Sequence, residues 1–445
     1  MKNSYKKCKL QKGLNKKIIR YISSIKNEPD WMLNFRLKSF DNFKKIKMPK
    51  FGPDLSFINF SSYTYFSREM QNIKNNWENV PLKIKNIFKK TGILEAEQKI
   101  LSGVAAQYES EVIYNNLIIE LKKKGVIFLS TDQAIQKYPK IVKKYFGKVI
   151  SNNDNKFSAL NGAVWSGGVF IYIPKNVHLE KPLQSYFRIN NNKFGQFERT
   201  LIIVDEGASV HYLEGCSAPI FSNDSLHASV VEIVVLKNAK CRYSTIQNWS
   251  TNVINLVTKR AVVYENGTME WIDGNIGSLI NMKYPACILK EKKATGICIS
   301  IAISTEKQFQ DTGARMIHLA PNTHSTVISK SIVSNGGTAN YRGTVRHSKI
   351  AINSSSHVEC DTLMLDDFSK SDTIPKNEIF NNKSFIEHET IISKINEEKL
   401  FYLMSKGINK KKAIELIIVG FISPFSNELP IEYAVEFNRI IKMYF

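Results

Sequence analysis

Residues 227–247, HASVVEIVVLKNAKCRYSTIQ, contain the pattern that decides the fold. β-Branched and aromatic residues alternate with polar ones on both sides of a short turn at Lys237–Ala239, which is typical of two successive strands. The pattern recurs in RTLIIVDEGASVHYLEG (199–215), LVTKRAVVYENGTMEWIDG (256–274) and STVISKSIVSNGGTANYRGTV (325–345). The turns recur at roughly 30 residues, and no long helical pattern interrupts the strands from about Phe157 to Met364. We therefore predict a β-solenoid, because a β-sandwich would not need so many strands.

Helical patterns flank this β region. Apolar residues three or four apart predict helices early in the chain and again from Pro81 to Lys124, followed by a short strand in GVIFLST (125–131) and a helix over Gln133–Phe146. The chain from about Ile379 is again predicted to be helical, with amphipathic stretches at 409–425 and 430–445. The predicted organisation is a mostly helical region over 1–150, a β core over 151–378 and a helical region over 379–445.

Composition excludes several classes of protein. The 445 residues are 43% hydrophobic, which argues against global disorder, and six cysteines are too few for a disulfide scaffold. The net charge of +22 would suit nucleic acid, but no recognisable nucleic-acid module accompanies it. The abundance of Lys, Asn and Ile is what AT-rich coding produces, so we expect no nucleic-acid partner. Ala413–Ser423 is too short to span a membrane, and MKNSYKKCKL lacks the apolar core of a secretory signal.

The motif search is mainly negative. The sequence has no P-loop, no dinucleotide-binding glycine motif, no zinc-protease motif and no C-x-x-C pair, so nothing supports nucleotide chemistry or a local zinc knuckle in this chain. Cys241, Cys287 and Cys298 are expected to be small buried core residues. Cys216 follows a strand in EGCSAP, a turn sequence in which a thiol could be exposed, and Cys360 is expected at a strand start. Taken alone, both cysteines also fit a structural role.

Long segments of the chain resemble the SufB family, the scaffold subunits for iron–sulfur cluster assembly in the Suf system. The resemblance runs from about Gly13 to Phe445 and is carried by NEPDWMLNFRLKSF, GILEAEQKILSGVAAQYESEVIY, DNKFSALNGAVWSGGVFIYIP, YFRINNNKFGQFERTLIIVDEGASVHYLEGCSAP, YSTIQNW, VTKR, KYPACIL, DTGARMIH, YRGTV, ECDTLM and IEHETIISKI. It implies a right-handed parallel β-helix flanked by N-terminal and C-terminal helical regions. It also implies an assembly scaffold rather than an enzyme.

The resemblance implies a set of partners. The β-helix would pair with SufD or with a second SufB, and the C-terminal region would dock the SufC ATPase, which would hydrolyse the ATP. SufS and SufE would donate sulfur, and carrier proteins would accept the finished cluster. The basic, Lys/Asn/Ile-rich chain with its short lead suggests a plastid or apicoplast protein encoded in the organelle, with a bacterial cytoplasm as the alternative.

The resemblance assigns sulfur acceptance to Cys216, the cysteine of the EGC-x-AP motif. The chemistry requires a thiolate that can attack a persulfide sulfur. Five residues match positions that line a path through the β-helix: Arg188, Asn190, Gln247, Trp249 and Lys259. The cations could stabilise an anionic persulfide. The alternative is that these side chains form a satisfied polar core.

Cluster assembly is placed by the resemblance at Cys360, His388 and Glu389. A thiolate suits iron, and an imidazole or carboxylate gives the labile ligation useful to a scaffold that releases its product. The implied product is a transient 4Fe-4S cluster, with a reduced flavin as a further component of the complex. Ser369 and Asp372 stand where many relatives have a cysteine and a histidine, which removes one candidate ligand.

The sequence leaves two alternative functions. A SufD-like interaction subunit would organise the SufC ATPases without building a cluster. A carbohydrate-active β-helix enzyme is disfavoured by the resemblance and by the lack of a signal peptide. The EGC and CD-[ST]-L cysteines, which SufD generally lacks, favour SufB.

Overall fold

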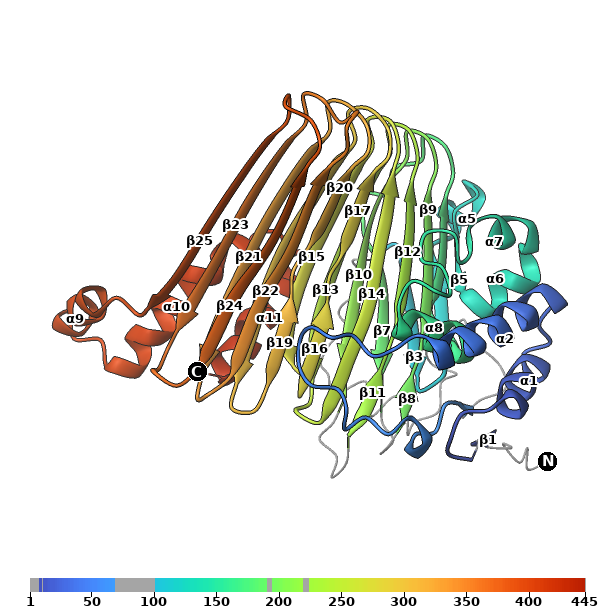
Figure 1. The fold of residues 1–445 in the computed structure, drawn as a ribbon, viewed down its shortest axis with the longest axis horizontal. Coiled ribbons are helices and arrows are strands. Elements are labelled where there is room, and N and C mark those ends of the chain that lie inside the picture. The colour runs from blue at the N-terminus through green and yellow to red at the C-terminus, as the bar shows by residue number, and fades with distance from the viewer. Residues whose placement is uncertain (1–7, 10, 69–100, 190–193, 219–223, 445) are drawn as a thin grey trace.

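The computed structural model describes residues 8–9, 11–68, 101–189, 194–218 and 224–444. The described chain forms a parallel β-solenoid of about seven turns with helices near both ends of the sequence (Figure 1). Strands account for 43% and helices for 24%, so the protein is mainly β and the predicted fold class is confirmed.

One wall of the solenoid is a ten-stranded sheet. Its strands are parallel except for the antiparallel pair β3–β4 at one edge. In spatial order they are β25 (Phe385–Lys394), β23 (Ser355–Met364), β21 (His324–Ser334), β18 (Thr295–Thr305), β15 (Thr268–Gly277), β13 (Lys240–Trp249), β10 (Ser209–Ser217), β7 (Leu183–Arg188), β3 (Gly103–Tyr108) and β4 (Glu111–Leu117).

The facing wall is a thirteen-stranded sheet, counted over the described residues, and its strands are parallel except for β5–β6. Its main path is β16 (Ile280–Lys283), β19 (Phe309–Thr312), β22 (Thr338–His347), β20 (Arg315–His318), β17 (Ala286–Leu289), β14 (Val253–Val263), β12 (Val230–Val235), β9 (Arg199–Val204), β6 (Val169–Ile173) and β5 (Ile127–Ser130). Three further strands pair beside this path: β8 (Gly195–Gln196), β11 (Ser225–His227) and β24 (Lys370–Ile379). A separate small sheet pairs β1 (Cys8–Lys9) with β2 (Ser67–Arg68).

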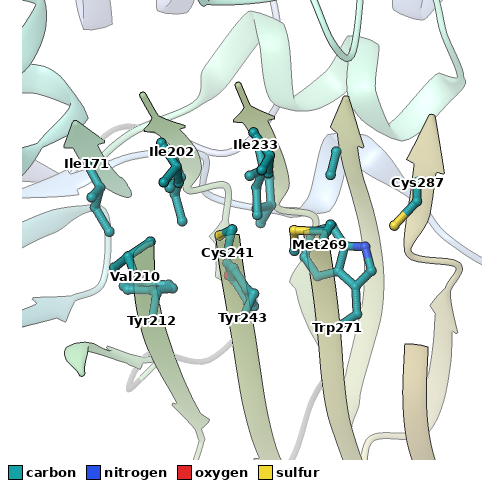
Figure 2. Packing of buried hydrophobic residues seen from close by; sticks show 14 of the residues in the cluster. Ile171, Ile202, Val210, Tyr212, Ile233, Cys241, Tyr243, Met269, Trp271 and Cys287 are labelled. Atoms are coloured by element: carbon teal, nitrogen blue, oxygen red, sulfur yellow. The ribbon is translucent and has the colours of Figure 1, made fainter. Parts of the chain in front are cut away.

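The core between the walls is a stack of equivalent positions. Ile171, Ile202 and Ile233 are aligned on β6, β9 and β12, and Val210 and Cys241 are aligned on the opposite wall (Figure 2). All five are buried. Parallel strands in register place the same inward position of each turn in one row, so every turn buries its apolar face against its neighbours.

The turns between strands rely on residues that tolerate a left-handed backbone. Asn238, Asn266 and Asn335 have φ of 56°, 52° and 54°. Asparagine adopts this conformation more readily than most residues with a side chain. Asn266 Nδ2 also donates to Asn238 Oδ1 at 2.8 Å, which joins one turn to the next. The turns predicted at these positions are confirmed.

Helices cover the outer faces of both walls. Those in the first part of the chain are α1 (Lys16–Ile25), α2 (Asp30–Lys45), η1 (Phe60–Ser62), α5 (Ile119–Lys123), α6 (Thr131–Lys137), α7 (Pro139–Tyr145) and α8 (Lys156–Val164). Phe40 of α2 and Phe157 of α8 belong to the hydrophobic cluster formed with Leu256 of the thirteen-stranded sheet. The C-terminal helices are α9 (Glu397–Ser405), α10 (Lys410–Ser426) and α11 (Ile431–Tyr444). Ile418 and Phe437 from these helices pack on the ten-stranded sheet. None of the described helices has the length and apolar character needed to cross a membrane.

Three predicted elements differ from the structure. The helix predicted from Pro81 to Lys124 is wrong for Gly103–Leu117, which forms β3 and β4, because β3 continues the parallel ladder from β7; residues 81–100 lie outside the described ranges. The helix predicted from Ile379 is wrong for Phe385–Lys394, since β25 continues the ladder from β23. Residues 156–164, placed with the strands, form α8. The division of the chain at residues 150 and 378 stays a prediction.

Candidate functional site

Cys216 lies near the end of β10, with its side chain inside the solenoid. The parallel register places it beside Phe187 of β7 and Gln247 of β13. The residue is 4% exposed, and its Sγ lies 3.8 Å from Glu214 Oε1. The prediction of an exposed thiol in a turn is wrong, because β10 continues to Ser217 and encloses the sulfur.

The surroundings of Cys216 oppose ionisation and yet hold cations nearby. Burial raises the pKa of the thiol well above its usual value, and the carboxylates of Glu214 and Glu198 raise it further. The ammonium groups of Lys259 and Lys283 act in the opposite direction. Because the thiolate is the nucleophile in sulfur transfer, the balance between these acids and lysines controls the reactivity of Cys216.

Lys259 is the centre of a buried charge cluster next to Cys216. It projects inward from β14, and its Nζ lies 2.6 Å from Thr245 Oγ1, 3.3 Å from Asp273 Oδ1 and 4.0 Å from Glu214 Oε1. The ammonium also lies 4.4 Å from the centre of the Tyr243 ring, whose hydroxyl donates to Glu214. Each ion therefore has a partner, as burial of charge requires.

Lys283 of β16 adds a second cation to this cluster. Its Nζ lies 3.2 Å from Asp273 Oδ1 and 3.4 Å from Gln247 Oε1. Burial, reinforced by the like charge of Lys259, lowers the pKa of Lys283 to about 8, although Asp273 opposes the shift. Burial alone would raise the pKa of Asp273, but the two lysines lower it below its usual value. Asp273 is therefore a shared anion between two ammonium groups.

Gln247 connects this cluster to a chain of buried amides. Asn255 Nδ2 donates to Gln247 Oε1 at 3.1 Å and to Asn281 Oδ1 at 2.6 Å. Asn281 Nδ2 in turn donates to Gln310 Oε1 at 2.8 Å. Gln247 Nε2 has no hydrogen-bond partner among the described residues. A buried donor without a partner indicates an interior that accommodates a polar guest, such as water or an anion.

Trp249 forms the aromatic part of the same region. Its ring lies 4.8 Å from the ring of His227, measured between centroids, and His227 also contacts Glu198 and Asn255. Trp249 Nε1 is buried without a hydrogen-bond partner in the part of the chain that the structure describes. Trp249 thus offers a second unused donor to the interior.

Arg188 lies at the edge of this region. It ends β7, and its Nη1 donates to Ser217 Oγ at 2.9 Å, one residue after Cys216. Burial lowers the pKa of the guanidinium below its usual value. Of the residues expected to line a sulfur path, Gln247, Trp249 and Lys259 lie on the inner side with Cys216, whereas Arg188 is in register with Ser217 and so points to the opposite face of the sheet. Asn190 lies outside the described residues.

A continuous row of inward polar positions runs from the Cys216 region to Cys360. In the register of the ten-stranded sheet, each member lies beside the next, in the order Glu214, Thr245, Asp273, Ser300, Ser329, Cys360. All six residues are buried, and Ser300 Oγ donates to Ser329 Oγ at 3.2 Å. Five strand-to-strand steps of about 4.8 Å make the row about 24 Å long. One row of the inner face is thus polar between the two cysteines, while neighbouring rows are apolar.

Cys360 and His388 are brought together near the end of the solenoid. Cys360 Sγ lies 3.7 Å from His388 Nε2, on the neighbouring strands β23 and β25. Burial raises the pKa of the Cys360 thiol to about 12, while a hydrogen bond with Tyr341 acts to lower it. Burial also lowers the pKa of His388, which favours the neutral imidazole that metals bind.

Glu389 does not join this pair. It is exposed and lies beside Glu359 in the register, and successive residues of a strand point to opposite faces. The described residues contain no group of three or more His, Cys, Asp or Glu side chains arranged to hold a metal. Ser369 is buried in a turn where it donates to Asp366 at 2.9 Å, and Asp372 lies on β24. Of the three predicted ligands, the structure therefore brings together two, Cys360 and His388.

The other described cysteines are core residues. Cys241 and Cys287 lie on the inner faces near Met269 and Trp271 (Figure 2), and Cys298 is equally buried. Burial raises the pKa of Cys287 to about 12 and shifts those of Cys241 and Cys298 in the same direction. The expectation that these three are buried is confirmed.

Comparison with known proteins covers almost the whole chain. Residues 187–421 match the family described as SUF system FeS cluster assembly, SufBD core domain, and residues 20–185 match the SufBD protein N-terminal region. An iron–sulfur cluster assembly SufBD family protein of Staphylococcus aureus (strain MRSA252) is 58% identical over 97% of this chain and 93% of its own length. A protein of the same description from Staphylococcus saprophyticus is 57% identical over the same shares. The chain belongs to the SufBD family.

Membership of the SufBD family gives the chain a general role in iron–sulfur cluster assembly, as the resemblance predicted. The family covers both SufB and SufD, so the match does not separate a scaffold from an interaction subunit. The relatives named above are bacterial, and they give no support to the plastid or apicoplast location predicted from composition.

Sequence reasoning missed several residues of this SufBD interior. Glu214, Asp273, Lys283 and Tyr243 belong to the charge cluster but were not selected. Glu214 lies within the EGC motif and Lys283 within KYPACIL, so both belong to segments that carry the resemblance. A usable signal was the roughly 30-residue turn spacing, which aligns inward positions of successive turns. Reading polar residues at that spacing would have placed Glu214 and Asp273 in one row.

Proposed function

We propose that this SufBD protein is a SufB-type scaffold that accepts sulfur at Cys216 and builds a cluster at Cys360. The observation that carries this proposal is the buried polar row from Glu214 to Cys360, with unpaired donors and two lysines beside Cys216. A structural core would place apolar side chains at most of these inward positions. A path for a polar sulfur species explains their presence.

The first step in the proposed function is persulfide transfer. The Cys216 thiolate attacks the outer sulfur of a persulfide on the sulfur donor, SufE or SufS. A sulfur–sulfur bond forms on Cys216 as the donor's bond breaks, and the donor cysteine leaves as a thiolate. Lys259 and Lys283 stabilise the negative charge on the new persulfide, and Arg188, beside Ser217, lies on the outer side of the same strand. Gln247 and Trp249, and Asn190 by resemblance, line the path beyond it.

The second step is cluster building at the end of the solenoid. Cys360 and His388 supply a thiolate and an imidazole, and iron and sulfide are the substrates assembled there. Glu389 lies on β25, an edge strand whose sheet pairing is with β23 alone, so rearrangement of this strand on partner binding would bring the carboxylate to the iron. Further ligands come from a partner subunit. The 4Fe-4S type and the reduced flavin remain predictions, and no step is assigned to the flavin.

Partners are assigned to two surfaces. β24 and β25 end the two walls and carry exposed apolar residues, including Ile374 and Ile391, where SufD or a second copy would pair. The C-terminal helices carry the exposed Phe401 and Tyr402, which suit docking of the SufC ATPase. Carrier proteins then take the cluster. A bacterial cytoplasm, the alternative location predicted above, fits the bacterial relatives.

Anaerobic reconstitution with iron tests this proposal. Wild type, C216A, C360A and the buried-cysteine control C298A are each supplied either with sulfide or with sulfur delivered by a cysteine desulfurase and SufE. Bound iron, bound sulfide and the thiolate-to-iron absorption band are measured, with SufC and SufD present. We expect C360A to lose the cluster under both conditions, C216A to lose it only with enzyme-delivered sulfur, and C298A to resemble wild type.

Two outcomes would overturn the proposal. If C360A retains a cluster as wild type does, Cys360 is not a ligand. If wild type holds no cluster with either sulfur source and with its partners present, the SufD-like interaction subunit takes its place. Circular dichroism of each variant verifies that a lost cluster does not reflect a lost fold.

A further inference from the structure

A pocket of about 320 Å³ lies on the outer face of the thirteen-stranded sheet, away from the path between the two cysteines. Its walls come from the irregular segment 46–51, the start of α8, and the strands β14 and β16. A volume of this size is at the lower end of the range for small-molecule sites. The pocket is therefore large enough for a compact ligand.

The pocket opens where the sheet is interrupted. β14 pairs with β16 through Val257 and with β17 from Arg260 onward. Thr258 and Lys259 lie between these two ladders, and both line the pocket. The interruption between β16 and β17 thus contributes to the hollow on this face of the wall.

The pocket is strongly cationic. Apart from Lys259, whose ammonium points into the solenoid, its lining contains one acid, Asp154, and four basic residues: Lys47, Lys156, Arg260 and Arg315. Two of these cations are already engaged. Arg260 Nη1 lies 2.6 Å from Asp154 Oδ1, and Lys156 Nζ donates to backbone carbonyls at 2.8 and 2.9 Å.

The two remaining cations of the lining are Lys47, which is exposed, and Arg315. Arg315 is half-buried, and the part of the chain that the structure describes gives its side chain no hydrogen bond or ion pair. Its guanidinium lies 5.5 Å from the centre of the Tyr284 ring. Burial and the neighbouring charge of Arg260 lower its pKa below the usual value. A half-buried guanidinium with its donors free is suited to bidentate binding of an oxyanion.

The side of the pocket next to Arg315 is aromatic and apolar. The rings of Phe51 and Tyr284 meet edge to face at a centroid distance of 6.1 Å, and Phe157 and Met282 complete this side. Phe51 is 41% exposed, and although the Arg342 guanidinium lies 5.0 Å from the centre of its ring, the exposed part of the ring can contact a ligand. Flat apolar groups pack well against such rings.

We propose that this pocket binds a small organic anion in which a phosphate or carboxylate group, held by Arg315, is joined to a flat apolar body packed against Phe51 and Tyr284. The site is separate from the proposed sulfur path and does not depend on it. It gives the protein a second binding function on its outer face.

Isothermal titration of the full-length protein tests the proposal with four probes: phenyl phosphate, benzoate, inorganic phosphate and phenol. We expect saturable binding of phenyl phosphate or benzoate, at least tenfold tighter than that of inorganic phosphate or phenol. R315Q should weaken this binding at least tenfold, and Y284L should weaken it severalfold. R346Q, which removes an exposed arginine on the same sheet, is the matched control and should bind as wild type does.

The two anionic probes identify the head group, because a phosphate site favours phenyl phosphate and a carboxylate site favours benzoate. The proposal is overturned if neither probe binds, or if inorganic phosphate binds as tightly as phenyl phosphate. It is also overturned if R315Q and R346Q weaken binding equally, since that would indicate general surface charge. Circular dichroism of R315Q excludes unfolding as the cause of lost binding.

Discussion

The two ends of the polar row differ in what surrounds their cysteine. Cys216 is enclosed among paired charges, with Glu214, Lys259 and Asp273 all inside the solenoid. Cys360 has a neutral interior neighbour, His388, on an edge strand, while its nearby acids point outward. The charged groups at the first end have ionic partners within the chain, although the donors of Gln247 and Trp249 have none among the described residues, whereas the second end lies beside the edge strand β25.

This difference shows how one solenoid can separate two tasks. Buried ions that pair with one another hold a fixed geometry and tune the ionisation of Cys216. An edge strand can change its contacts when a partner arrives, which suits a site that must admit iron and release a product. The predictions below test whether the two ends really differ in this way.

The largest expected difference concerns buried charge. K259M leaves the carboxylates of Glu214 and Asp273 with fewer cationic partners in the interior, so we expect the free energy of unfolding to fall by about 3–5 kcal/mol. K330M is the matched change at the other end, where Lys330 contacts Glu359 and Asp361 at 3.2 and 2.7 Å on the outer face. Because that pair is partly solvated, its loss should cost about 1 kcal/mol. Urea denaturation measures both.

Equal losses in the two variants would remove the distinction between a charged interior and a solvated outer face. The double variant K259M/E214Q gives a further check. It should recover part of the lost stability. The neutral amide of glutamine replaces the carboxylate of Glu214, so one fewer buried anion is left unpaired.

A second prediction concerns how the free energy of unfolding depends on pH. The folded pKa of Lys283 is about 8, below its unfolded value of 10.5, so the unfolded chain binds this proton more tightly. The contribution of Lys283 to the free energy of unfolding must therefore rise with pH between these values. Between pH 8 and 9.5, wild type should gain about 1–2 kcal/mol relative to K283M. Denaturation curves at several pH values measure the difference.

Lys330 is the comparison residue in this pH experiment, because its pKa is shifted in the other direction. Although burial acts to lower it, ion pairs with Asp361 and Glu359 raise the pKa of Lys330 above its usual value. Its stabilising contribution is therefore complete below the unfolded pKa of 10.5 and is lost only at higher pH. The difference between wild type and K330M should stay level from pH 8 to 9.5, and a rise there would contradict the assignment.

The repeated strand pattern was enough to predict the solenoid, because parallel stacking makes each turn carry the same local signal. The local pattern failed at Gly103–Leu117 and Phe385–Lys394, which were predicted to be helical. Each segment joins a sheet by pairing with a strand elsewhere in the sequence, β7 for the first and β23 for the second. Cys216, Gln247 and Lys259 were selected by resemblance. Asp273 and Lys283 were not selected, because they meet only across the two facing walls of the solenoid. Local sequence patterns carry no information about that contact.

The smallest expected effect concerns the thiols themselves. Glu214 is, after burial, the largest cause of the raised pKa of Cys216, whereas for Cys360 the effect of Asp361 ranks below both burial and the opposing hydrogen bond with Tyr341. Removing one nearby carboxylate lowers a thiol pKa by about one unit, which corresponds to about a tenfold rise in thiolate at a fixed pH below the pKa. E214Q should therefore increase modification of Cys216 about tenfold at pH 8.5, and D361N should increase that of Cys360 less than about threefold.

Methyl methanethiosulfonate is a suitable reagent, because it is small and reacts with the thiolate, and peptide mass spectrometry separates Cys216 from Cys360. Local opening of the fold would also expose both thiols, so Cys298 serves as the internal control in every sample. If E214Q increases labelling of Cys298 as much as that of Cys216, the variant has loosened the core rather than altered an ionisation. If Cys216 is unchanged while Cys360 responds to D361N, then the electrostatically tuned thiol lies at the open end, and the proposed order of sulfur transfer must be reversed.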